Sequence, residues 1–461
     1  MTGSLFFAKF ATALLVLSLN VGTHAAECVV PHNENGTDDS PAILEAFTTC
    51  AEDSVITFQQ KNYSAYTPMS WVNLKNVTIN LQGNLLLPKN ITAVQIAINE
   101  TNNQPSTYAT PWYYIHGEEV TFKGSNQSQW GAFHGFGQQW WDIENQTLRP
   151  QLATFNVTNG TLSGLKVIKP VAWGWNIPGK NVLVENHYVD AKPNNGTRNS
   201  TISFPFNTDG FNLSGQNITI DGYWGENGDD CVSVVSGARD ITALNGYCGF
   251  SSHGLSIGSL GKNGANSTVA NVLFNNWTMD GAVYGSRFKS WTGGNGWAEN
   301  VTWSNIHLIN VSTAIFITQN YFDQEVGKPT GAGANATKVV NFHYENFTGS
   351  LNGNWTDGTC SIILDLYNDT ATNLTFTNIS VSQHNGSNPN VLCDASALAP
   401  GEQSTLGFNC TDGPFKVTSV NSSSSTGGKS GSSGALSVRN DAVHVISIIV
   451  APVMIAMLSM F

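Results

Sequence analysis

Charged residues are scarce in this chain of 461 residues. Only 11% of the residues are Asp, Glu, Lys or Arg, and 20 basic against 32 acidic residues give a net charge of −12. An acidic surface repels a phosphate backbone, so no nucleic-acid partner is expected. Coiled coils and charged disordered segments are excluded as well, because both need far more charge. Basic residues are so few that two of them beside acidic ones call for a specific explanation.

Long helical periods are also lacking, whereas glycine and turn residues are abundant. The chain has 45 Gly and is 41% hydrophobic. A short phrase recurs in it: Asn or Asp, then an alternating run of β-branched, aromatic and Thr residues, then Asn, Asp or Gly, which predicts a short strand between turns. The phrase begins at Asn76, Asn181, Asn217, Asp240, Asn271, Asn300 and Asn373. From Asn181 to Asn300 it returns every 23 to 36 residues or so, as in a solenoid.

Several short strands per repeat, with no helices between them, predict an all-β fold. The favoured form is a parallel β-helix, whose coils stack about 4.8 Å apart. A β-sandwich of hairpins is the alternative, but Asn-Gly and Asp-Gly pairs do not sit as two-residue loops between matched strands. One domain, residues 26–420, then accounts for the length, and we expect it to be a monomer.

The two ends of the chain are predicted to lie outside this domain. Residues 1–25 carry Lys9, an apolar run and a small-residue cleavage site after Ala25, which indicates a secretory signal peptide. A membrane anchor is the alternative, but the run is shorter than the roughly 20 residues that span a bilayer.

A Ser/Gly-rich linker, 421–442, and an apolar tail, 443–461, are typical of a GPI-anchor signal with attachment near Ser432. A plain C-terminal membrane helix is the alternative, although no Lys or Arg follows the tail.

The cysteines and the sequons agree with secretion. All seven cysteines lie in the mature region without the C-x-x-C spacing of a zinc site, so disulfides are expected. Proximity in the sequence pairs them as Cys28–Cys50, Cys231–Cys248 and Cys393–Cys410 and leaves Cys360 over. About two dozen Asn-x-Ser/Thr sequons predict an extracellular glycoprotein, although many of these Asn residues are equally typical of turns.

Four short polar segments stand out in the middle of the chain. They are Asn207-Thr208-Asp209-Gly210, Gly228-Asp229-Asp230-Cys231, Ser252-His253-Gly254 and Arg287-Phe288-Lys289. Asp209, Asp229, His253 and Arg287 follow one another at spacings of 20, 24 and 34 residues. In a solenoid with coils of about that length, each segment returns to one side, and side chains one coil apart start only about 5 Å from each other. The sequence therefore predicts one site built from all four segments.

Three carboxylates in one cleft cannot all ionise independently, because like charges raise the pKa of at least one of them. Inverting glycoside hydrolysis needs such a set: a protonated acid donates to the leaving oxygen while an ionised base activates water on the opposite face. Each feature also has a simpler interpretation. Asp229-Asp230 alone is typical of a solvated turn or a cation site, and a lone His-Gly is often structural. Arg287 and Lys289, on one face of a strand, could merely neutralise a neighbouring Asp.

In order and form, the four segments resemble the signature of the polygalacturonase family of glycoside hydrolases, NTD, (Q/G)DDC, (G/S)HG and R-I-K. The resemblance covers nearly the whole mature chain. It implies a right-handed parallel β-helix that hydrolyses α-1,4-linked galacturonate in pectin, the polygalacturonate substrate. It implies no cofactor and no metal.

The resemblance also implies a role for each matching residue. Asp229 is the expected general acid, and Asp209 and Asp230 are expected to act on the nucleophilic water. His253 is expected to maintain the protonation state of the acid. The expected substrate-binding residues are Asn207, Arg287, Lys289 and, from a weaker match, Tyr321, with the two cations holding the galacturonate carboxylate.

Departures from the family pattern favour exo action. Gly228 and Ser252 resemble the exo-acting branch, whereas endo-acting members more often have Gln and Gly there. Asn320 stands where exo-type relatives tend to have Cys, which fits an unpaired Cys360. The first hypothesis is therefore an exo-polygalacturonase. An endo-polygalacturonase or branched-galacturonan hydrolase is the second, and a pectin-binding surface protein without turnover is the third.

Overall fold

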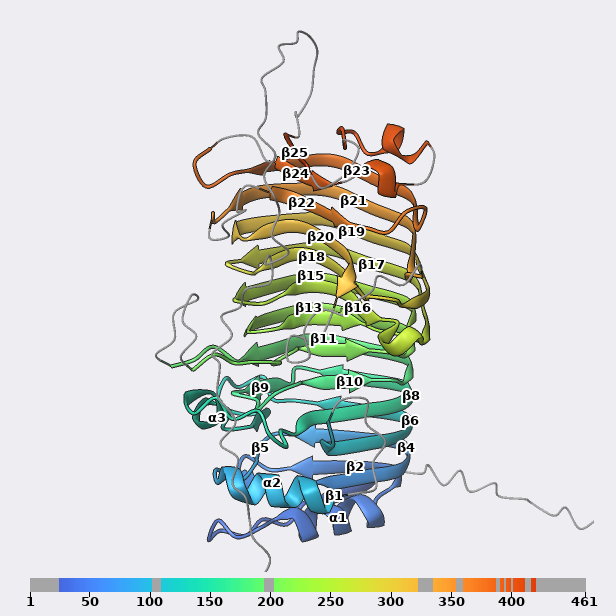
Figure 1. Cartoon of the computed structure of the whole chain (residues 1–461). Helices are drawn as coiled ribbons and strands as arrows, with labels where there is room; N and C mark the ends of the chain where they lie inside the picture. The colour runs from blue at the N-terminus through green and yellow to red at the C-terminus, as the bar shows by residue number, and fades with distance from the viewer. Residues whose placement is uncertain are drawn as a thin grey trace, which may run out of the picture.

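The computed structural model describes residues 25–101, 109–194, 203–321, 335–353, 360–386, 390–393, 395–398, 401–410 and 416–419. In these residues the chain winds into an elongated stack of coils, which Figure 1 shows from the blue N-terminal end to the red C-terminal end. The 25 strands pair in parallel, except for the antiparallel pair of β24 (Asn390–Cys393) and β25 (Lys416–Ser419). The predicted single-domain parallel β-helix is confirmed.

Eight short strands pair one above another and form what we call the site sheet. They are β10 (Trp175–Ile177), β12 (Phe211–Leu213), β14 (Asp230–Val234), β16 (Gly254–Leu260), β18 (Tyr284–Trp291), β20 (Thr313–Tyr321), β22 (Cys360–Asp365) and β24. Toward the N-terminus, the first residues of three longer strands continue the same sheet: β8 (Gln151–Ser163), β6 (Pro111–Lys123) and β4 (Met69–Leu81).

The longer strands form most of the remaining wall. They are β2 (Glu52–Phe58), β4 (Met69–Leu81), β6 (Pro111–Lys123), β8 (Gln151–Ser163), β11 (Lys180–Asp190), β13 (Gln216–Asn227), β15 (Arg239–Phe250), β17 (Asn266–Asp280), β19 (Asn295–Val311), β21 (Lys338–Leu351) and β23 (Ala371–Ser382). The N-terminal coils add β1 (Ala26–Val29), β3 (Asn62–Ser64), β5 (Asn84–Leu86), β7 (Ala132–His134) and β9 (Lys166–Ile168).

The recurring Asn of the sequence marks the corners of the coils. Asn181, Asn217, Asn271 and Asn300 have φ angles of 54°, 52°, 57° and 54°, in the left-handed region that Asn tolerates better than most residues. Their side chains stack between coils: Asn217 Nδ2 donates to Asn181 Oδ1 at 2.9 Å, and Asn300 Nδ2 donates to Asn271 Oδ1 at 3.1 Å. The recurring sequence pattern therefore repeats once per coil, as expected. Its Asn, however, lies at a bend inside a long strand and not in a turn between two strands.

Aromatic and aliphatic side chains fill the interior of the solenoid. The Trp303 and Tyr344 rings stack with centroids 4.9 Å apart, and they lie in neighbouring coils. At the N-terminal end, helix α1 (Ser40–Thr49) stacks Phe47 on Trp71 at 4.0 Å. The other helices are α2 (Ile91–Glu100), α3 (Gln138–Asp142) and the 3₁₀ turns η1 (Lys262–Gly264), η2 (Ala395–Ala397) and η3 (Glu402–Thr405). This continuous core fixes the spacing of the strands that carry the site.

Three disulfides confirm the pairing expected from proximity. They are Cys28–Cys50, Cys231–Cys248 and Cys393–Cys410. Cys360 begins β22, and its side chain is not among those described. The predicted signal peptide (apart from Ala25), the 421–442 linker and the 443–461 tail lie outside the described residues.

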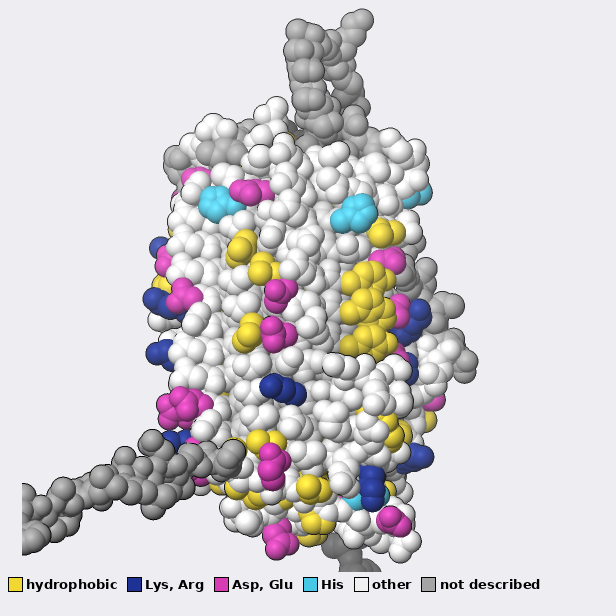
Figure 2. Space-filling view, turned by 180° about the vertical axis from the view of Figure 1, so that it is seen from behind, with side chains coloured by type: hydrophobic (Ala, Val, Ile, Leu, Met, Phe, Trp, Pro, Cys, Tyr) yellow, Lys and Arg dark blue, Asp and Glu magenta, His cyan; other side chains and the backbone are white. Residues whose placement is uncertain are grey.

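The outer surface is mixed in charge. On the face seen in Figure 2, Lys and Arg side chains lie singly among Asp and Glu, and one vertical column of hydrophobic side chains stands out. Within the described part of the chain, no helix has the length and apolar character needed to cross a membrane.

Candidate active site

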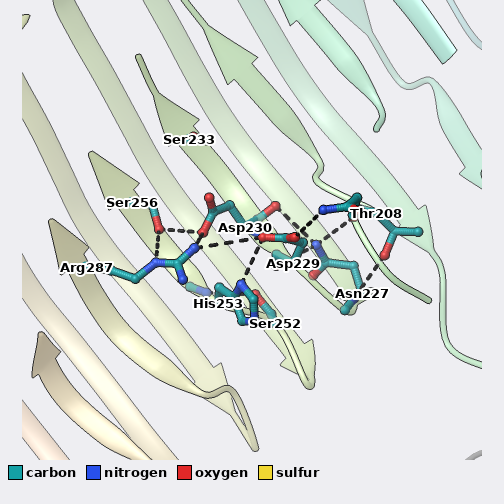
Figure 3. Close-up of polar contacts among 12 residues, drawn as sticks. Thr208, Asn227, Asp229, Asp230, Ser233, Ser252, His253, Ser256 and Arg287 are labelled. Atoms are coloured by element: carbon teal, nitrogen blue, oxygen red, sulfur yellow. Dashed lines mark hydrogen bonds and ion pairs between the residues drawn. The ribbon is translucent and has the colours of Figure 1, made fainter. Parts of the chain in front are cut away.

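The four polar segments meet on the site sheet, as their spacing predicts. Asp209 lies just before β12, Asp229 just before β14, and His253 just before β16, while Arg287 lies within β18. Parallel pairing of these strands stacks the segments: Ser233 is level with Ser256 and Ser256 with Arg287. Figure 3 shows the side chains of these coils converging on Asp229 and Asp230.

Asp230 is the buried centre of the cluster. Its side chain is only 1% exposed, and Arg287 Nη2 donates to Oδ1 at 2.5 Å while Lys289 Nζ donates to Oδ2 at 2.9 Å. Ser256 Oγ also donates to Oδ1, and Arg287 Nε donates to Ser256 Oγ at 3.1 Å. Both cations thus neutralise one carboxylate in the unliganded protein, which is the simpler of the two roles that the sequence allowed for them.

The two cations stay charged despite their burial. Burial lowers the pKa of Arg287, but Asp230, Tyr284 and Asp229 raise it by more. Burial and the Arg287 charge lower the pKa of Lys289, and Asp230 again reverses the effect. Fixed positive charge is therefore present on the floor of the site at any pH at which the fold persists.

Asp229 is more accessible and is held as an ionised carboxylate. Its Oδ1 lies 2.9 Å from His253 Nδ1 and accepts from the backbone N–H of Asp230 at 2.9 Å, while Oδ2 accepts from Asn207 Nδ2 at 3.2 Å. Burial by itself raises the pKa of Asp229, but His253 and the two cations lower it below the usual carboxyl value.

Asp209 has the opposite electrostatics. Its side chain is 8% exposed, and Oδ1 has no hydrogen-bond partner among the described residues. Burial raises the pKa of Asp209 well above its ordinary value, and the negative charges of Asp229 and Asp230 raise it further, against a smaller opposing effect of Lys289. Burial and the neighbouring charges therefore shift the two pKa values in opposite directions, upward for Asp209 and downward for Asp229, so a proton shared among the three carboxyls is held more readily by Asp209.

The loop that carries the carboxylates is held by Asn227, which the sequence analysis did not single out, and by close packing at Gly228. Asn227, at the end of β13, donates through Nδ2 to the carbonyls of Thr208, Asp229 and Asp230 at 2.8, 2.9 and 3.1 Å. Gly228 has a close neighbour: a Cβ there would lie 2.6 Å from the Pro205 carbonyl oxygen. Packing against the preceding coil therefore explains why this chain has Gly and not Gln before its Asp pair.

Tyr321 ends β20 and lies beside Lys289. The Lys289 ammonium is 5.6 Å from the centroid of its ring, and the ring meets Trp291 edge-on at 5.0 Å. Trp291 in turn lies under Lys262 Nζ at 4.7 Å. The structure thus brings all eight predicted site residues together on the site sheet and the loops before its strands. It also places the Trp291 ring next to Tyr321.

Asp229, Asp230 and His253 offer ligand atoms within 4.8 Å of one another, close enough for a metal ion. However, both oxygens of Asp230 already accept from Arg287, Lys289 or Ser256. Two fixed cations on that carboxylate repel a third positive charge. The donor set therefore fits proton transfer better than metal binding.

Comparison with known proteins agrees with the geometry. The chain is 36% identical over 443 residues to a protein from Aspergillus terreus named "Probable exopolygalacturonase C", covering 89% of this chain and 98% of that one. The endo-xylogalacturonan hydrolase of Aspergillus tubingensis shares its fold with a TM-score of 0.67 at 21% identity, over 84% of this chain and 99% of that one. An exopolygalacturonase from Thermotoga maritima has a TM-score of 0.56 at 15% identity, over 85% and 94% of the two chains.

These structural neighbours confirm the predicted handedness, a right-handed parallel β-helix, and the protein is a glycoside hydrolase. Residues 68–397, which include every site residue named above, match the sequence model of the family described as "Glycosyl hydrolases family 28". The chain belongs to glycosyl hydrolases family 28.

Proposed function

We propose that this protein is an exo-polygalacturonase, which removes terminal galacturonic acid from α-1,4-linked polygalacturonate by inverting hydrolysis. The observation that carries the proposal is the cluster of three carboxylates, His253 and two buried cations on one sheet. Carboxylates supply the acid and the base of glycoside hydrolysis, and the cations suit a sugar that bears its own carboxylate. The name of the Aspergillus terreus relative supports exo action.

In this proposal Asp229 is the general acid, and it gains its proton when substrate binds. Arg287 and Lys289 have N–H donors that Asp230 does not use, and a galacturonate carboxylate takes them. The added negative charge weakens the influence of the cations on Asp229 and so raises its pKa. The proton held by Asp209 in the unliganded site then moves to Asp229, and the number of protons in the site does not change.

The same transfer prepares the base. Asp209, once ionised, accepts a proton from the attacking water together with Asp230, while Asp229 protonates the leaving oxygen. His253, 2.9 Å from Asp229, holds the acid in place, and Asn207 and Tyr321 contact the sugar. After hydrolysis Asp209 holds the proton taken from the water and Asp229 is again ionised, so the site is back in its starting protonation state when the product leaves.

We further propose that the enzyme is a secreted, extracellular glycoprotein and that a GPI anchor holds it at the cell surface. The three disulfides support an oxidising compartment, and the two terminal segments support cleavage at both ends. Treatment of intact cells with a phosphatidylinositol-specific phospholipase tests the anchor. The enzyme is expected in the supernatant, and retention on the membrane would contradict the proposal.

The experiment for the activity itself is a timed digestion of polygalacturonate with the purified mature protein. Chromatography of the products is expected to show galacturonate monomer from the first time point and no short oligomers. Early mixed oligomers would indicate an endo-acting enzyme, and binding without release of reducing sugar would indicate a non-catalytic pectin-binding protein. The Asp229→Asn variant is the control for contaminating hydrolase.

A further inference from the structure

Arg149 lies outside the four motifs, yet its guanidinium reaches the site. It lies two residues before β8, and only 7% of the residue is exposed. Nη1 donates to the carbonyl of Phe206 at 2.7 Å, and Nη2 donates to Oδ1 of Asn207 at 2.6 Å. The Trp173 ring, in the coil between, lies 5.0 Å from the guanidinium carbon. A buried arginine is costly unless its donors are used, so these contacts define its position.

The contact with Asn207 continues to the reacting groups. Asn207 Nδ2 donates to Asp229 Oδ2 at 3.2 Å, and Asp229 Oδ1 meets His253 at 2.9 Å. Arg149, Asn207, Asp229 and His253 therefore form one chain of polar contacts along the solenoid axis. The four residues lie in the segments that precede β8, β12, β14 and β16.

Arg149 determines which way the Asn207 amide points. An amide has an oxygen that only accepts and an NH₂ group that only donates, whereas a guanidinium only donates and a carboxylate only accepts. With its oxygen on Arg149, Asn207 must present NH₂ to Asp229. The flipped amide would place two donors together at Arg149 and two acceptors together at Asp229. The backbone of Asn207 has φ of 59°, and the bond from Arg149 to the preceding carbonyl holds that residue too.

We propose that Arg149 is a positioning residue of this enzyme: it fixes the Asn207 amide and, through it, the carboxyl orientation of Asp229. The role rests on the proposed function of Asp229 as the acid. Arg149 does not bind the substrate carboxylate in this account, because Nη1 donates to Phe206 and Nη2 donates to Asn207 and, at 3.4 Å, to Gln146 Oε1. Its loss should therefore lower kcat and leave KM nearly unchanged.

The test is a double-mutant cycle on turnover of polygalacturonate. Arg149→Gln is expected to reduce kcat by about 10- to 100-fold, the factor that corresponds to losing a charge-assisted hydrogen bond, with KM changed less than about threefold. Asn207→Ala alone should also reduce kcat. In the Asn207→Ala background, Arg149→Gln should reduce kcat by less than about threefold, because the amide through which Arg149 acts is gone.

Two further variants keep the test decisive. Arg149→Lys retains the charge and one contact, so its kcat should lie between those of the wild type and Arg149→Gln. If Arg149→Gln does not fold, the same cycle is run with Arg149→Lys. Arg239→Gln, which removes an exposed arginine, is the matched control and should behave as the wild type.

Three results would overturn the proposal. They are full additivity of the Arg149 and Asn207 substitutions, an unchanged kcat in Arg149→Gln, or a rise in KM without a fall in kcat. Absence of hydrolytic activity in the wild-type protein would contradict the proposed function itself. The coupling between Arg149 and Asn207 is a separate result, because it is measured relative to the active wild type.

Discussion

Asp209→Asn is expected to make the protein more stable at neutral pH, although it removes a residue of the proposed machinery. Asp209 is almost fully buried and lies beside two other carboxylates, which raises its pKa well above the ordinary value. Ionising it in the folded state is therefore unfavourable. Asparagine has nearly the same shape and no charge, so the variant avoids this cost.

The sign and size follow from proton linkage. Between the unfolded pKa of an Asp, about 3.9, and the raised native pKa of Asp209, the folded state binds one more proton than the unfolded state. Stability of the wild type falls through this window by about 1.4 kcal/mol for each pH unit, and the Asn variant does not share that loss. Below about pH 3.9 Asp209 is protonated in both the folded and the unfolded state, so this difference in stability between Asp209→Asn and the wild type should vanish.

Asp229→Asn is the matched control with the opposite sign. Its pKa is lowered by His253, Lys289 and Arg287, so the ionised form stabilises the fold above the unfolded pKa, and that stability is lost as the pH falls through the lowered native pKa. This variant should be less stable than the wild type near neutral pH, and the difference should shrink in acid.

Urea unfolding of the three proteins between about pH 2 and pH 7 measures both effects, because the Asp209 effect grows above about pH 3.9 and the Asp229 effect is lost only below it. The free energy of unfolding is compared at each pH, so that other titrating groups cancel in the differences. A loss of stability in Asp209→Asn near neutral pH, or a gain that does not change with pH, would refute the assignment of the proton to Asp209.

Three further predictions concern activity and the supports of the site. Asp229→Asn should lower kcat by about 100- to 10,000-fold, the usual value of general acid catalysis, while circular dichroism shows a retained β-helix; near-normal turnover would exclude Asp229 as the acid. Lys289→Ala should raise KM for polygalacturonate. It should also reduce the free energy of unfolding by about 3 kcal/mol, because Asp230 loses one of its two buried cationic partners. A change in KM alone would show that this ion pair does not stabilise the fold. The Cys231→Ser/Cys248→Ser double variant should lose about 3 kcal/mol, the chain-entropy value for a link over 17 residues, and an unchanged midpoint in urea would contradict it.

The fold could be predicted from the sequence because the corners of the coils favour Asn, and these Asn residues recur with the period of the coil. Asn181, Asn217, Asp240 and Asn271 recur at about the length of a coil because each adopts the same left-handed corner. Asn217 donates to Asn181, and Asn271 donates to Asp240. The disulfides could be predicted because their partners are near in sequence, 22, 17 and 17 residues apart. Regular structure of this kind is local in sequence and therefore readable from it.

The chemistry of the site was less accessible, because it depends on contacts between distant coils. Arg287 is 57 residues from Asp230 and Arg149 is 58 residues from Asn207, and no local pattern indicates either pair. The spacing of the four segments, the match to the R-I-K motif and the scarcity of basic residues pointed to Arg287 and Lys289, but none of them pointed to Arg149. The opposite pKa shifts of Asp209 and Asp229 could not be read from the sequence either, since they depend on how the buried carboxyls lie relative to two cations and a histidine.

The most direct test of the central claim is ¹H NMR of the first product released from polygalacturonate by the purified protein. An inverting exo-polygalacturonase converts the terminal α-linkage into free galacturonate whose β anomer appears first and then mutarotates. The account predicts the β signal of the monomer in the earliest spectra and its absence with Asp229→Asn. Initial appearance of the α anomer, or of oligomers in place of monomer, would contradict it.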